Sequence, residues 1–177
     1  KMNQIMLRAA AQDYSLQGKM GRDLSNCTVG VIGTGKIGST VIRHLAGFGC
    51  KLLAYDLHPC DEVRSLAEYV PLDELYARSD VITLHLNATP ENRHLIDDSA
   101  IAQMKPGTLL INTARGTLID PDALVRGLES GKLGGAGLDV VEDENGLCYY
   151  NRCGEALPNR ELNLLRSFPN VIVSPHT

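Results

Sequence analysis

The sequence predicts an α/β fold: a doubly wound parallel sheet with helices on both faces, a three-layer αβα arrangement. Three observations favour this class. Short apolar or β-branched runs alternate with stretches of helical periodicity from residue 28 to residue 174. A glycine-rich turn joins the first such run to the first helix. Residues 108–112 are apolar almost without interruption, which is typical of a central parallel strand.

Each element is expected from its own local pattern. Apolar residues at helical spacing predict a helix over residues 1–13, followed by a connector over residues 15–26 with two glycines. Strands are expected at residues 29–32, 52–55, 81–86, 108–112, 134–141 and 171–174. Helices are expected from residue 36, at 61–66, at 71–76 with proline in the first turn, at 98–104, from 120 or 121 to 130, and at 161–167. Residues 87–92 and 142–160 are polar and lack periodicity, which predicts loops.

The chain is organised around residues 28–56, which have the pattern strand, glycine turn, helix, second strand and acid. Gly33, Gly35 and Gly38 have G-x-G-x-x-G spacing, and Asp56 follows Gly38 by 18 residues. In the Rossmann fold these glycines permit the tight turn, the approach of a pyrophosphate and close helix packing, and an acid roughly 20 residues on binds the ribose. The helix would begin near Lys36, with its N–H groups facing the phosphates. A tight turn without a nucleotide is the alternative interpretation.

Composition limits the partners and the compartment. The 177-residue chain has 44% hydrophobic residues, a net charge of −4 and no long basic run, so we expect one globular domain that binds neither nucleic acid nor membrane surfaces. No apolar run approaches the roughly 18 residues of a spanning helix, and no signal peptide is visible, which favours a cytoplasmic location. The cysteines are odd in number and lack C-x-x-C spacing, which favours reduced thiols and predicts no metal site: Cys27, Cys50, Cys60, Cys148 and Cys153.

Five polar residues lie at or just beyond the expected strand ends: Asp56, Arg115, Asp139, Glu144 and His176. Ligands of open parallel sheets bind outside the carboxyl ends of the strands. An arginine can hold a substrate carboxylate with its forked donors, and a histidine can protonate a carbonyl oxygen while a carboxylate stabilises its charge. With a hydride from a nicotinamide, this set predicts reduction of a keto acid.

Each of these residues also has a purely structural interpretation. Arg115 could cap a helix or pair with Asp120, and Asp139 could close a turn. Glu144 lies in the acidic run 142–144, which would usually be a solvated face. His176 could be a surface histidine after a proline turn. The joint placement at strand ends is what favours the catalytic interpretation.

Four segments in the same order resemble the D-isomer-specific 2-hydroxyacid dehydrogenase family. They are Val-Gly-Val-Ile-Gly-Thr-Gly-Lys-Ile-Gly at 29–38, Ile-Asn-Thr-Ala-Arg-Gly at 111–116, Gly-Leu-Asp-Val-Val-Glu-Asp-Glu at 137–144, and Ser-Pro-His-Thr at 174–177. The resemblance covers almost all of residues 24–177 and implies NAD as the cofactor. It also implies that Arg115 binds the substrate carboxylate, Glu144 orients and charges the histidine, and His176 is the acid/base.

The same resemblance assigns the cofactor contacts. Besides the glycines, Arg115 and His176, the matching positions are Lys36, Ile37, Asp56, Leu86, Asn87, Asn92, Thr113, Ala114 and Asp139, with Asp139 at the nicotinamide carboxamide. The family usually has proline where this chain has Asn87, so the resemblance does not predict the conformation of that loop.

Within the family, Gly-Leu-Cys-Tyr-Tyr-Asn at 146–151 and the long stretch before residue 161 resemble the D-lactate dehydrogenase branch, including the vancomycin-resistance type. Pyruvate and D-lactate are thus the expected 2-keto and 2-hydroxy acids. Another D-2-hydroxy acid, or a non-enzymatic NAD(H)-sensing role like that of related corepressors, stays open.

The resemblance also implies a division of the chain. Residues 24–177 correspond to the dinucleotide-binding domain, and residues 1–23 to a helix and connector that cross between domains and support a homodimer. The family's substrate domain has no counterpart here, so we expect this sequence to be the cofactor half of a longer protein.

Overall fold

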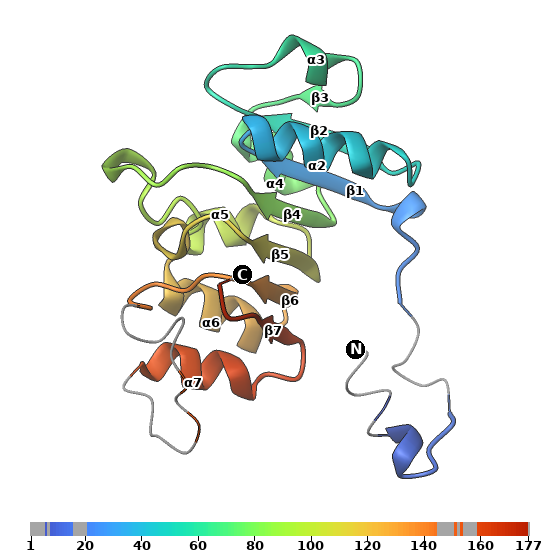
Figure 1. Cartoon of the computed structure of the whole chain (residues 1–177), viewed down its shortest axis with the longest axis vertical. Coiled ribbons are helices and arrows are strands. Elements are labelled where there is room, and N and C mark those ends of the chain that lie inside the picture. The colour runs from blue at the N-terminus through green and yellow to red at the C-terminus, as the bar shows by residue number, and fades with distance from the viewer. Residues whose placement is uncertain are drawn as a thin grey trace.

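The computed structural model describes residues 6, 8–15, 21–144, 151, 153 and 159–176. These residues form a sheet of seven strands, all paired in parallel, in the order β3-β2-β1-β4-β5-β6-β7. Figure 1 shows this order running from β3 at the top to β7 below. The strand order reverses between β1 and β4, so the prediction of a doubly wound α/β fold is confirmed.

The element bounds follow the predicted pattern closely. The strands are β1 (Thr28–Ile32), β2 (Lys51–Tyr55), β3 (Glu68–Tyr69), β4 (Val81–Leu84), β5 (Thr108–Asn112), β6 (Leu133–Leu138) and β7 (Val171–Val173). The α-helices are α2 (Lys36–Ala46), α3 (Asp61–Arg64), α4 (Leu72–Arg78), α5 (Asp98–Gln103), α6 (Pro121–Glu129) and α7 (Arg160–Ser167). The described residues also form three 3₁₀ turns: η1 (Leu24–Asn26), η2 (Pro90–Asn92) and η3 (Gly116–Leu118).

Side-chain caps explain where several helices begin. Asp97, Asp120 and Asn159 each accept a hydrogen bond from a backbone N–H of the first turn of α5, α6 and α7. Such caps satisfy N–H groups that have no partner within the helix. Helix α2 differs, because its N-cap is Gly35 and makes no side-chain hydrogen bond. The first N–H groups of α2 therefore face the edge of the sheet without a side-chain cap.

Some predicted bounds were wrong. The predicted strand 81–86 ends at Leu84, and the predicted strand 134–141 ends at Leu138, so the polar groups that follow lie in loops. The predicted helix 1–13 extends too far: of its described residues, 6 and 8–10 are helical, and the chain turns at Gln12, where φ is 61°. Strand β3 was missed because two residues carry no periodicity.

Two hydrophobic clusters lie on opposite faces of the sheet. The larger contains Ile32, Leu84 and Leu110 and packs against α4, α5, α6 and α7, whereas the smaller contains Val31 and packs against Ile42 of α2. This division follows from right-handed crossovers, because the chain reverses its direction across the sheet after β3. The described helices leave the β5–β7 part of the second face open, and a groove of about 350 Å³ lies there.

None of the helices in the described part of the chain combines the length and the hydrophobicity that a membrane span requires. The four cysteines that the structure covers, Cys27, Cys50, Cys60 and Cys153, are free thiols.

Candidate active site

The glycine turn brings the end of β1 against α2 at the point where the strand order reverses. Gly33 has φ +95°, and a Cβ there would lie 2.7 Å from the His85 carbonyl. A Cβ on Gly38 would lie 1.9 Å from the Gly33 carbonyl oxygen, so helix and turn are in backbone contact. A Cβ on Gly35 would meet nothing within 4 Å. The open space at Gly35, beside the uncapped start of α2, fits the approach of a pyrophosphate.

Asp56 directly follows β2 and faces the same turn. Its Oδ2 accepts hydrogen bonds from the backbone N–H of Thr34 at 2.6 Å and from the Thr34 hydroxyl at 3.2 Å. Its Oδ1 accepts one from the His58 N–H at 2.8 Å. The carboxylate is therefore fixed beside the glycine turn, in the place that the Rossmann pattern gives to the ribose-binding acid.

Beyond Leu84, the chain forms the loop that faces the glycine turn across the strand reversal. The side-chain amide of Asn92 donates to the Asn87 carbonyl and accepts from the Thr89 N–H, both at 2.8 Å. Asn92 thus shapes the loop on which Asn87 is exposed and Leu86 is half-buried. His85 is half-buried, and desolvation holds its pKa below the ordinary value. Ile37, another apolar position assigned to the cofactor, is 68% exposed at the start of α2.

Arg115 lies beyond β5 in a loop organised by Asn112. The buried Asn112 accepts from the Ala114 N–H at 3.0 Å and donates to the Arg115 carbonyl at 2.9 Å. Arg115 is exposed and its Nη1 donates to the Ala114 carbonyl at 2.7 Å. Thr113 is exposed beside it. Asp120, the alternative partner considered above, instead caps α6.

The loops beyond β6 and β7 bring the remaining polar residues together. His176 Nδ1 lies 2.7 Å from Glu144 Oε1, and Glu144 Oε2 accepts from the Val141 N–H at 3.2 Å. Asp139 Oδ1 accepts from the Ser174 hydroxyl at 2.6 Å. The His176 backbone has φ 59°. Glu144 is therefore paired with a histidine and not simply part of a solvated acidic face.

One cluster, formed by Arg93, His94 and Glu142, was not predicted from the sequence. Glu142 Oε1 accepts from Arg93 at 2.6 Å, and its Oε2 lies 2.8 Å from His94 Nε2. Burial opposes ionisation of Glu142, but these two hydrogen bonds outweigh it and lower its pKa. Because the pKa of Glu142 is lower in the folded state than in the unfolded state, its ionised form stabilises the fold at pH values above the unfolded-state pKa. This stabilisation is lost as the pH falls through the folded-state pKa. The cluster joins the loops that follow β4 and β6.

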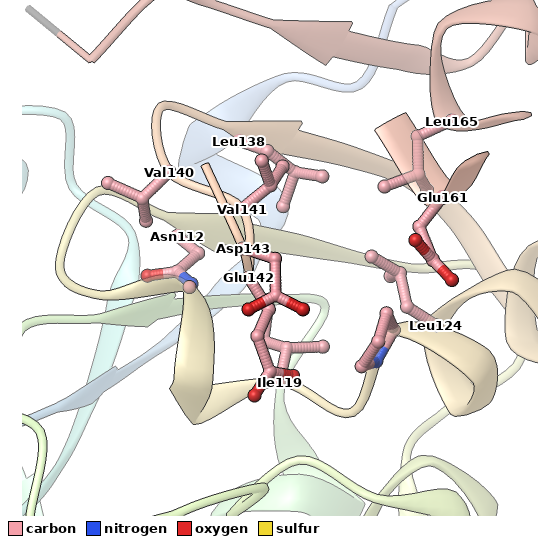
Figure 2. A pocket seen from close by; sticks show the side chains of 12 residues that line it. Asn112, Ile119, Leu124, Leu138, Val140, Val141, Glu142, Asp143, Glu161 and Leu165 are labelled. Carbon is pink, nitrogen blue, oxygen red and sulfur yellow. The ribbon is translucent and has the colours of Figure 1, made fainter. Parts of the chain in front are cut away.

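Behind these loops lies a small cavity, shown in Figure 2. It is lined by residues such as Asn112, Leu138, Glu142 and Leu165, and its volume is about 90 Å³. Ligand pockets are typically about 300–1,000 Å³. The cavity is therefore too small for a dinucleotide, and the candidate site is the open edge formed by the strand ends. The described residues contain no cluster of three or more histidine, cysteine or acidic groups suited to a metal ion.

The parallel sheet, the glycine turn at its strand reversal and the acid after β2 define a dinucleotide-binding α/β domain. The chain belongs to the D-isomer specific 2-hydroxyacid dehydrogenase family, because the model of that family's NAD-binding domain matches residues 1–177. NAD is accordingly the cofactor, and solved relatives carry it.

Individual relatives agree with this assignment. A D-specific alpha-keto acid dehydrogenase of Enterococcus faecalis is 47% identical over 95% of this chain and 51% of its own length. An aromatic 2-oxoacid reductase of Clostridium sporogenes is 45% identical over 96% and 51%. The structure of D-lactate dehydrogenase from Aquifex aeolicus with NAD and lactic acid is 41% identical, with a TM-score of 0.90 over 99% of this chain and 54% of that one. The chain thus spans about half the length of the relatives it matches.

Selectivity for NADH over NADPH is the first testable consequence of Asp56. A 2′-phosphate would meet the carboxylate as a like charge, which should cost at least about 1–2 kcal/mol, or roughly tenfold in affinity. We expect NADH to bind this chain at least tenfold more tightly than NADPH in a fluorescence titration. Asp56→Ala should reduce the ratio between the dissociation constants of NADPH and NADH. Equal binding of the two cofactors by the unmodified chain would contradict the role of Asp56.

Proposed function

We propose that the full-length protein reduces 2-oxo acids to D-2-hydroxy acids with NADH, with pyruvate and D-lactate as the favoured pair. The observation that carries the proposal is the 2.7 Å contact between His176 Nδ1 and Glu144 Oε1, at the edge of the sheet that also holds the glycine turn. A histidine held by a carboxylate is suited to donate and accept a proton.

In this proposal each residue has a separate task. Arg115 holds the substrate carboxylate with its forked donors. His176 donates a proton to the carbonyl oxygen through Nε2, while Glu144 orients the ring and stabilises its positive charge. Asp139 is proposed to hold the carboxamide of the cofactor, and the Ser174 hydroxyl fixes the Asp139 carboxylate. The cofactor, when bound, supplies the hydride.

The remaining cofactor positions are proposals of the same kind. Gly33, Gly35 and Gly38 would admit the pyrophosphate, and Asp56 would bind the adenosine ribose. Lys36, Ile37, Leu86, Asn87, Asn92, Thr113 and Ala114 would line the cofactor. The rest of the full-length protein is proposed to supply the substrate domain, and the whole to act as a cytoplasmic homodimer.

The relatives make the side chain of the substrate the point to test. Pyruvate is favoured by the resemblance of residues 146–151 to the lactate branch, of which residues 146–150 lie outside the described part of the structure. One relative, 45% identical, is an aromatic 2-oxoacid reductase. The experiment is NADH oxidation by the full-length protein with a series from pyruvate to phenylpyruvate. Pyruvate turnover with a D product is expected. Turnover restricted to bulky 2-oxo acids would refute the choice of pyruvate. NADH binding without turnover of any 2-oxo acid would favour the alternative of a non-enzymatic NAD(H)-sensing protein.

A further inference from the structure

A hydroxyl on the edge strand β3 reaches the glycine turn, although neither the motif nor the proposed mechanism includes it. Tyr69 donates from its hydroxyl to Thr34 Oγ1 at 2.7 Å. The same hydroxyl oxygen accepts from the backbone N–H of Cys60 at 2.9 Å. The Arg64 guanidinium lies 5.3 Å above the centre of the Tyr69 ring. The tyrosine is therefore fixed at both its ring and its hydroxyl.

Thr34 connects this tyrosine to Asp56. Thr34 is 2% exposed, and both its backbone N–H and its hydroxyl donate to Asp56 Oδ2, at 2.6 and 3.2 Å. A threonine hydroxyl has a single proton. Because Thr34 Oγ1 accepts the hydrogen bond from the Tyr69 hydroxyl, its own proton is directed to Asp56.

The acceptor sites of Asp56 are then largely occupied by the protein. An ionised carboxylate has about four lone-pair sites. Oδ2 accepts two hydrogen bonds from Thr34, and Oδ1 accepts one from the His58 N–H. The site left open is therefore on Oδ1, and its direction is set by the bonds that hold Oδ2.

We propose that Tyr69 is a positioning residue for cofactor binding: through Thr34 it holds Asp56 so that Oδ1 presents its open lone pair to a ribose hydroxyl. The inference rests on the proposed role of Asp56 as the ribose ligand. Without the Tyr69 hydroxyl, the Thr34 hydroxyl is free to rotate, and binding must then order both side chains. Pre-organisation of this kind increases affinity by reducing the ordering cost.

The test is a cycle of variants of this chain, with the dissociation constant of NADH measured by fluorescence. Tyr69→Phe keeps the ring under Arg64 and should weaken NADH binding about 3–10-fold, the range for one lost hydrogen bond. Thr34→Val removes the connecting hydroxyl at similar volume and should weaken binding to a similar extent. In an Asp56→Ala background, Tyr69→Phe should raise the dissociation constant of NADH by less than about twofold, because the carboxylate that Tyr69 positions is absent.

Tyr76→Phe is the matched control. Tyr76 lies in α4, is 4% exposed, and its hydroxyl has no hydrogen-bond partner among the described residues. Its removal should leave NADH affinity unchanged within about twofold. If Asp56→Ala weakens binding while Tyr69→Phe does not, the inference is wrong and the proposed ribose contact stands. If Tyr69→Phe weakens binding equally with and without Asp56, the tyrosine acts on the fold and the inference is also wrong. An Asp56→Ala variant with unchanged affinity would overturn both.

Discussion

Replacing His176 by alanine in the full-length protein is expected to lower kcat for 2-oxo acid reduction by about 10²–10⁴-fold, the usual contribution of a positioned acid. The substitution removes the proposed proton donor, which follows β7, whereas the glycine turn and Asp56 follow β1 and β2. The dissociation constant of NADH should therefore change much less than kcat. Stopped-flow measurement of a single turnover, together with a fluorescence titration of NADH, separates the two quantities.

Glu144→Gln tests whether His176 works with Glu144 as a unit. The amide has similar size but no charge, so the ring would keep a hydrogen-bond partner and lose the stabilisation of its protonated form. We expect a loss of kcat smaller than that of His176→Ala. Residues that act together are strongly non-additive, so the double variant should be no slower than His176→Ala alone.

Another histidine provides the matched control. His44 is exposed in the last turn of α2, away from the strand ends that hold His176, and His44→Ala should leave kcat within about twofold of the unmodified protein. A His176→Ala protein that retains most of its kcat would show that the proton comes from another group. Multiplicative losses in the double variant would show that Glu144 and His176 act independently.

The order of the elements was predictable because each leaves a local pattern. β5 has three consecutive apolar residues between Thr108 and Asn112, and Pro121 begins α6 directly after the Asp120 cap. The errors have local causes too. Two residues of β3 are too short to show a period, and the helix expected over residues 1–13 ends early because Gln12 takes a left-handed backbone conformation.

The candidate site also has a part that was predictable from the sequence and a part that was not. The strand ends place Asp56, Arg115 and Glu144 at one edge, and parallel topology makes this predictable from the order of the strands. Contacts between side chains on distant segments leave no such signal. The Arg93–Glu142 pair and the Tyr69–Thr34 bond join residues 49 and 35 positions apart, on segments whose relative placement follows only from the packed fold.

Two glycines of the turn should separate folding from cofactor binding. Gly38→Ala places a Cβ 1.9 Å from the Gly33 carbonyl oxygen, a backbone atom that cannot move away alone. Forcing extra volume into a closely packed contact costs typically about 1–3 kcal/mol and occasionally more, and we expect the upper end, about 3 kcal/mol. For a domain of this size, that loss lowers Tm by about 6–12 °C. Thermal unfolding followed by circular dichroism measures it.

Gly35→Ala is the counterpart. Gly35 has φ −63°, and a Cβ there meets nothing within 4 Å, so alanine fits the backbone. As an N-cap, alanine is less favourable than glycine by at most about 1 kcal/mol, so Tm should change by less than about 4 °C. The methyl group would occupy the space through which the pyrophosphate approaches, and NADH affinity should fall about tenfold or more. If Gly35→Ala binds NADH normally, the phosphates do not approach the chain at this turn, and the role assigned to its glycines is wrong.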